Sequence, residues 1–153
     1  MGIIAGLFGR SADRKAQKLE RNAEEILNAL KRKDHKKALA LVKNLDSVYF
    51  QEYGDKTTLL TLSSFVGYAD ICKMMIDKGA NVNVVDTQGR TALMAAAQIG
   101  SKEVVKLLLD NGADAFIETS SGTTALKIAA KIGSKEVVDL IVENEGGSVL
   151  LWD

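Results

Sequence analysis

The sequence predicts an all-α solenoid of stacked helix–turn–helix units joined by short hairpin loops. The main observation is an internal repeat of 33 residues: residues 86–112 and 119–145 are identical at 15 of 27 positions, whereas chance would give on the order of two. Each copy contains two apolar helical stretches of roughly eight to ten residues, separated by a glycine. Helices that short are marginal in water, so each pair must pack against its neighbours.

The first predicted element is a long amphipathic helix over residues 12–30. Its apolar residues at positions 12, 16, 19, 23, 26 and 30 are spaced by four, three, four, three and four, which is the stripe of one helix face. We interpret this helix first as a cap over the core of the first repeat. A contact with another chain is one alternative. Association with a membrane surface is the other, because an apolar start at residues 3–8 precedes Arg10, Arg14, Lys15 and Lys18.

A degenerate copy of the repeat follows this helix. One period upstream of the clear copies, the apolar register falls on Leu27, Ala38, Leu39 and Val42. The basic run at residues 31–37 lies at the turn between the first two helices, where we expect solvated side chains. His35 has no cysteine or carboxylate at ligand spacing, so we expect no metal site there.

The clear copies have recognisable start and stop signals. Residues 86–89 have turn chemistry, and Thr91 is the predicted N-cap of a helix that ends near Ile99. Gly100 precedes a second helix that begins after Ser101, has a broad apolar face and stops at Asn111–Gly112. The last copy repeats each of these steps.

The shared pattern G-x-T-A-L-x-x-A-A-x-x-G-x-x-E-V-V-x-L-L-L-x-x-G-A-D resembles the ankyrin repeat. The resemblance covers about residues 21–147. It implies an N-terminal extension (1–20), a degenerate capping repeat (21–52), three repeats (53–85, 86–118 and 119–147) and an apolar tail (148–153). The family's T-P-L-H motif has lost its Pro and His, since it appears as Thr58-Leu-Leu-Thr61, Thr91-Ala-Leu-Met94 and Thr124-Ala-Leu-Lys127. The first full copy also has Lys56 in place of the turn glycine, which predicts a distorted hairpin.

The two ends of the repeat array need covering. Val149-Leu-Leu-Trp152 is apolar and follows the last repeat, so we expect it to fold back as a cap, with a docking tail as the alternative. An aromatic group at residues 49–53 lies near the first hairpin and is either core or a binding anchor. The charge is also divided between the two ends, with a net +5 in residues 1–46 and −5 in residues 47–153.

Composition and motifs argue against catalysis. The chain has 153 residues, no net charge, 46% hydrophobic residues and 26% charged residues, which is typical of an ordinary globular protein. It contains no phosphate-binding loop, zinc-protease motif or serine-nucleophile motif. Cys72 is the single cysteine, which we interpret as a core residue in a reducing compartment. We therefore predict no enzyme, no cofactor and a cytoplasmic location.

The resemblance implies that a partner protein binds the concave surface formed by the hairpin tips and the first helix of each repeat. Val66, Ile99 and Ile132 form one row of that surface, which is either an exposed apolar stripe or packing between repeats. We predict a monomeric protein-binding module that does not bind nucleic acid. The alternative is a membrane-attached adaptor or an inhibitor or immunity-type protein of a cognate enzyme, located by its N-terminal segment. Carried over by register, the contact positions are Tyr53, Asp55, Thr57, Phe65, Val66, Thr87, Gln88, Arg90, Gln98, Ile99, Ser120, Ser121, Thr123, Lys131 and Ile132.

Overall fold

The computed structural model describes residues 5–45 and 59–146, with side chains described from residue 13 onward. These residues form eight helices: α1 (Ala5–Lys31), α2 (His35–Lys43), α3 (Leu59–Val66), α4 (Ala69–Asp77), α5 (Ala92–Ile99), α6 (Lys102–Asp110), α7 (Ala125–Ile132) and α8 (Lys135–Asn144). The expectation of an all-helical solenoid is confirmed. The predicted distorted hairpin at Lys56 and the aromatic group at residues 49–53 lie outside the described residues.

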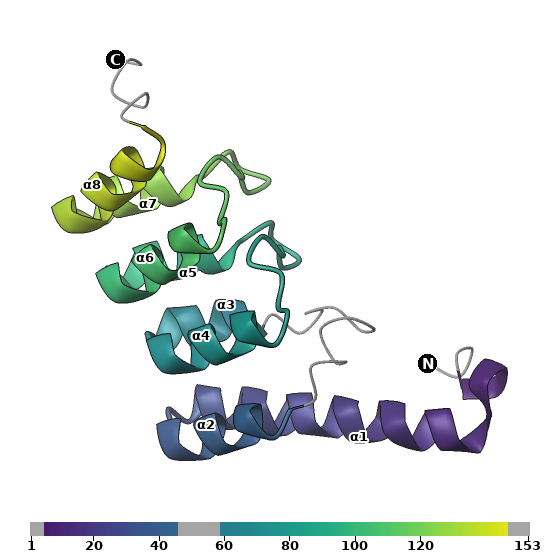
Figure 1. Ribbon diagram of the computed structural model, residues 1–153. Coiled ribbons are helices and arrows are strands. Elements are labelled where there is room, and N and C mark those ends of the chain that lie inside the picture. The colour runs from purple at the N-terminus through teal and green to yellow at the C-terminus, as the bar shows by residue number, and fades with distance from the viewer. Residues whose placement is uncertain (1–4, 46–58, 147–153) are drawn as a thin grey trace.

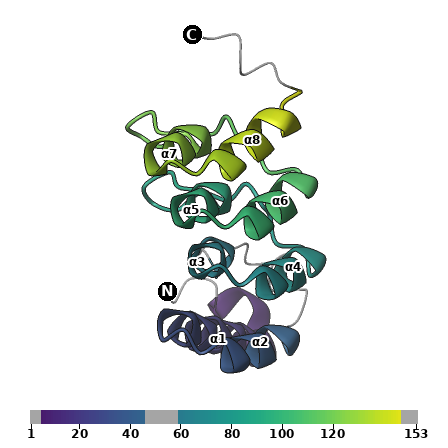
Figure 2. The ribbon, with the colours of Figure 1, turned by 90° about the vertical axis from the view of Figure 1, so that its left-hand side faces the viewer.

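The helices form two parallel layers (Figure 2). The first helices of the pairs, α1, α3, α5 and α7, contact one another in order, and α2, α4, α6 and α8 do the same behind them. Because each helix packs on the equivalent helix of the next unit, the array is a stack with one face formed by first helices. The N-terminal part of α1 extends past the stacked repeats (Figure 1).

Local signals in the sequence set the helix boundaries. The Thr91 hydroxyl accepts a hydrogen bond from the Met94 backbone N–H at 3.2 Å, and Thr124 does the same for Lys127. Helices α5 and α7 therefore each have a side-chain N-cap without a proline in the first turn. Gly100 ends α5 in the left-handed region at φ 69°, a conformation that glycine adopts without steric cost. The predicted bounds of α5 and α6 are thus confirmed.

The core runs through the whole stack. The centre of α5 is buried on almost every side, since residues 92–97 lie between α3, α6 and α7. Small alanines make up most of this segment and allow the neighbouring helices to approach closely. At the N-terminal end, the apolar stripe of α1 is buried from Leu19 onward, with Ala23, Ile26 and Leu30 beneath α3 and beside α2. This part of α1 therefore covers the core of the first repeat.

Candidate partner-binding surface

A groove of about 420 Å³ crosses the face formed by the first helices. It receives side chains from α1, α3, α5 and α7, and its rim includes one hairpin loop. Its apolar lining residues are Leu27, Leu62, Phe65, Met94, Ala95 and Ile128. Its polar lining residues are Lys31, Thr61, Asp86, Arg90 and Gln98. An apolar floor with a polar rim is the usual composition of a protein interface.

The repeat spacing builds this groove. Leu62, Ala95 and Ile128 are 33 residues apart and lie at the same position of α3, α5 and α7. One turn further along the same helix face are Phe65 and Gln98, which also line the groove. Residues three apart on a helix are surface neighbours, so α3 and α5 each contribute two adjacent positions to the groove, whereas α7 contributes Ile128 alone. Of these residues, Phe65 presents the large apolar side chain, and it is 46% exposed.

The structure places the sequence-predicted residues in several environments. Phe65, Arg90 and Gln98 line the groove. Thr87, Gln88, Ser120 and Ser121 are exposed at the hairpin tips, Thr123 is half-buried there, and Lys131 is exposed on α7. Tyr53, Asp55 and Thr57 lie outside the described residues.

The row of Val66, Ile99 and Ile132 is partly packed between repeats and partly an exposed apolar stripe. Val66 is half-buried and packs against the core. Ile99 is 40% exposed, yet its Cδ1 atom is so close to Gly67 of the preceding repeat that a Cβ there would be only 3.2 Å away. Ile132 is 49% exposed. The row therefore packs between repeats at one end and faces solvent at the other.

Several groove residues were absent from the sequence prediction. Leu27 and Lys31 come from α1. The repeat register had placed Leu27 at a core position, but it is half-buried and lines the groove. Leu62, Met94 and Ile128 lie one turn upstream of positions that were predicted. The spacing of residues on a helix could have identified some of them from the sequence, because residues three apart are surface neighbours and Leu62 therefore lies beside Phe65. Applied to α3, α5 and α7, it would have extended the predicted surface to the groove floor.

Asp86 and Arg90 form a fixed charged pair at the rim. The Asp86 carboxylate accepts hydrogen bonds from the backbone N–H groups of Gln88 and Arg90, both at 2.9 Å, and from Arg90 Nε at 2.8 Å. Burial acts to raise the pKa of Asp86, but these hydrogen bonds and the charge of Arg90 outweigh it and lower the pKa below its ordinary value. The pair thus holds the hairpin and presents a guanidinium beside the groove.

The family comparison agrees with this arrangement. A family model described as ankyrin repeats in three copies matches residues 16–119 and residues 59–150. The chain belongs to the ankyrin-repeat family. No curated protein matches it by sequence. Ankyrin repeats are protein–protein interaction modules, whose repeats stack into extended concave binding surfaces.

At the histidine position of the ankyrin T-P-L-H motif, α5 and α7 have side chains without an imidazole ring. Met94 is buried and lines the groove, while Lys127 donates a hydrogen bond from Nζ to the Gly122 carbonyl of its own hairpin at 2.8 Å. Adjacent hairpins instead approach through their backbones. A Cβ at Gly89 would lie only 3.2 Å from Thr119 Cα of the next hairpin, and Gly89 has a φ of 77°, so both the close approach and the backbone conformation favour glycine.

His35 is not in a free turn. It is the first residue of α2, and its Nε2 lies 2.8 and 3.0 Å from the two carboxylate oxygens of Asp70 on α4. Its ring also packs edge-on against Tyr68, whose hydroxyl donates to the Lys33 carbonyl at 2.9 Å. The expectation of a solvated turn was therefore incomplete, because this turn fastens the α1–α2 cap to the first repeat.

The remaining reactive groups do not converge on a site. Cys72 is buried in α4, and the described residues contain no group of three or more His, Cys, Asp or Glu side chains that could hold a metal ion. Within residues 5–45 and 59–146, no helix has the length and apolar character needed to cross a bilayer.

Proposed function

We propose that this ankyrin-repeat chain is a non-catalytic module that binds a partner protein in the groove on its first-helix face. The single observation that carries the proposal is the groove itself, in which Leu62, Phe65 and Ile128 offer apolar surface inside a polar rim. A partner that presents apolar side chains along a helix or an extended segment fits this surface. Large aromatic side chains near the centre of an interface usually contribute most of its binding energy.

The experiment is affinity capture from the source organism with paired variants. Phe65→Glu places a charge on the groove floor, and we expect it to weaken retention of the partner by 100-fold or more while leaving the helical circular dichroism unchanged. The expected loss reflects the cost of desolvating a carboxylate without a counter-charge. Lys106→Ala is the control, since it changes net charge by the same single unit on α6, outside the groove. Equal retention by both variants would contradict the groove assignment.

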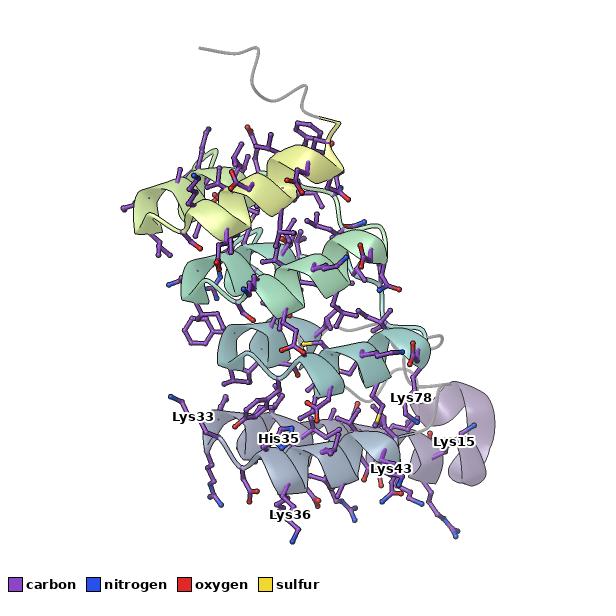
Figure 3. The ribbon with its side chains drawn as sticks, turned by 60° about the vertical axis from the view of Figure 1, so that its left-hand side comes forward. Lys15, Lys33, His35, Lys36, Lys43 and Lys78 are labelled. Atoms are coloured by element: carbon purple, nitrogen blue, oxygen red, sulfur yellow. The ribbon has the colours of Figure 1, made fainter. Side chains whose placement is uncertain are left out.

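The cationic surface of the cap supports a second candidate, which is docking on an anionic lipid bilayer. Residues 13–45 contain ten Lys and Arg but five Asp and Glu, and no ion pair within the described residues involves any of these ten. Lys33 lies in the turn before α2, Lys36 and Lys43 lie on α2, and Lys15 lies on the part of α1 beyond the repeats (Figure 3). Clusters of four to eight basic residues are typical of surfaces that bind anionic lipids.

Vesicle flotation tests this candidate. We expect the full chain to float with vesicles of phosphatidylserine and phosphatidylcholine, and to be released as salt is raised, because the attraction is screened. The variant Lys36→Glu with Lys43→Glu should lose flotation, whereas Lys102→Glu with Lys135→Glu in the array should keep it. Absence of flotation, or equal flotation with pure phosphatidylcholine, would remove the candidate.

A further inference from the structure

The exposed charges that line the first-helix groove are cationic. Lys31 lines the groove at its α1 end and Arg90 lines its hairpin rim, and both side chains are exposed. Among the described residues that line the groove, Asp86 is the single carboxylate. Its side chain is only 12% exposed, against 53% for Arg90, and its oxygens already accept hydrogen bonds from Gln88 and Arg90. The rim pair therefore presents its guanidinium, and not its carboxylate, to a partner.

Helix α7 adds a cation at the opposite end of the groove. Ile128 lines the groove, and Lys131 follows three residues later on the same helix face. Phe65, Gln98 and Lys131 are successive members of one row with a spacing of 33 residues, and the first two line the groove. Lys131 is exposed. Within residues 5–45 and 59–146, no ion pair involves Lys31 or Lys131, so each end of the groove has a lysine available to a partner.

The repeats place most of their acidic side chains away from this face. Helices α3 and α5 contain no charged residue, and the charged residues of α7 are Lys127 and Lys131. The second helices α4, α6 and α8 contain seven Asp and Glu but four Lys. On α1, Glu24 precedes Leu27 by one turn but does not line the groove, and Glu118 lines a separate cavity of about 240 Å³ at the last repeat. The acidic array is thus cationic on its first-helix face, which attracts negative charge.

Two other kinds of occupant match the groove less well. A small anion would leave the apolar surface of Phe65 and Ile128 uncovered, so the occupant must also supply apolar side chains. The amphipathic helix of a second copy would bring the wrong charge, because residues 5–18 of α1 contain four Lys and Arg but one Asp. Like charges would then meet at Lys31 and Lys131, which disfavours the pairing. The groove therefore suits a segment that is both apolar and acidic.

We propose that the occupant of the groove is an acidic amphipathic segment of a partner protein. Its apolar side chains contact Leu62, Phe65 and Ile128. Its flanking Asp or Glu side chains pair with Lys31 at one end and Lys131 at the other. This inference rests on the proposed function and adds the chemistry of the partner.

The spacing of the helices sets the length of the segment. Helices α1 and α7 are the outer members of the row of first helices (Figure 2), in which each helix contacts the next. Three interhelical steps of about 8–10 Å each separate them. The two lysines are therefore about 25–30 Å apart across the row, which corresponds to roughly 17–20 residues of helix or roughly eight or nine extended residues.

Peptide display on the full chain tests the proposal. The probe is a library of randomised peptides of about 20 residues, long enough to span the row as a helix. Parallel selections use the unmodified chain, Phe65→Glu, and the double variant Lys31→Glu with Lys131→Glu. We expect the peptides that require Phe65 to be acidic, with Asp or Glu on both sides of an apolar stretch. The charge-reversed variant should instead select peptides with Lys or Arg at those places.

One enriched peptide then measures the contribution of the two lysines. Its dissociation constant, determined by fluorescence anisotropy, should rise by roughly tenfold in Lys31→Ala with Lys131→Ala, because two exposed ion pairs are lost. The matched control is Lys102→Ala with Lys135→Ala, which removes the same charge from α6 and α8 and should change the constant by less than about twofold. Added salt should weaken binding to the unmodified chain more than to the Lys31 and Lys131 variant.

The outcomes separate this proposal from the function on which it rests. Peptides that require Phe65 but carry no excess of acid, or that bind the two double alanine variants equally well, would overturn the acidic partner and leave the groove as the binding surface. Basic peptides that require Phe65 would do the same and would indicate α1 of a second copy. If the enriched peptides bind Phe65→Glu as tightly as the unmodified chain, or if no peptide is enriched, both proposals fail.

Discussion

Leu93→Ala is expected to lower the free energy of unfolding by about 2–5 kcal/mol. Leu93 is completely buried in α5, which packs against α3, α6 and α7 at the centre of the stack. The substitution removes apolar contacts and leaves a cavity that rigidly packed neighbours fill only in part. Because each repeat is stabilised mainly through its interfaces with its neighbours, the loss affects the whole array.

Urea denaturation followed by circular dichroism measures this loss. The control is Ile132→Ala, which removes a side chain that is half exposed at the end of α7, and should cost less than about 1 kcal/mol. If the two substitutions destabilise the protein equally, α5 does not have the central packing role described here.

Cys72 is expected to react with thiol reagents about 1,000-fold more slowly in the folded protein than in the unfolded chain at pH 8. Burial raises the pKa of the Cys72 thiol to about 12, despite an opposing hydrogen bond with Ser64, whose Oγ lies 3.6 Å from Sγ. Asp70 raises this pKa further by charge repulsion. The reactive thiolate is therefore scarce in the folded state at pH 8, and the buried sulfur is also shielded from reagent.

The measurement is the rate of modification by a chromogenic disulfide, with and without urea at constant pH. Comparable rates in the two conditions would show that α4 does not bury Cys72. The same pKa shift predicts a pH dependence of stability. Above about pH 9 the unfolded chain loses the thiol proton while the folded chain keeps it until about pH 12, so the free energy of unfolding should fall across that range.

The array could be predicted from the sequence because its signals recur. Thr91 and Thr124 cap equivalent helices, and Gly100 and Gly133 end them in the same left-handed conformation. Each local preference is repeated 33 residues later, so one interpretation accounts for both copies. The buried state of Cys72 followed from the same register, since it aligns with the core residue Val105.

The contacts of the cap could not be predicted in this way. His35 meets Asp70, and Lys33 meets Tyr68, across a separation of 35 residues in each case. These pairs join a degenerate copy to a diverged one, where no repeated motif fixes the register of facing side chains. The contribution of Leu27 and Lys31 to the groove was missed for the same reason, because it depends on how α1 packs against α3.

Site-specific photo-crosslinking in the source organism tests the binding assignment most directly. A photoreactive phenylalanine analogue placed at Phe65 reports on the groove, and the same analogue at Lys106 reports on the outer surface of α6. We predict that the variant labelled at position 65 forms a covalent adduct with one partner protein and that the variant labelled at position 106 does not. An adduct formed from position 106, with none from position 65, would contradict the assignment of the first-helix groove as the binding surface.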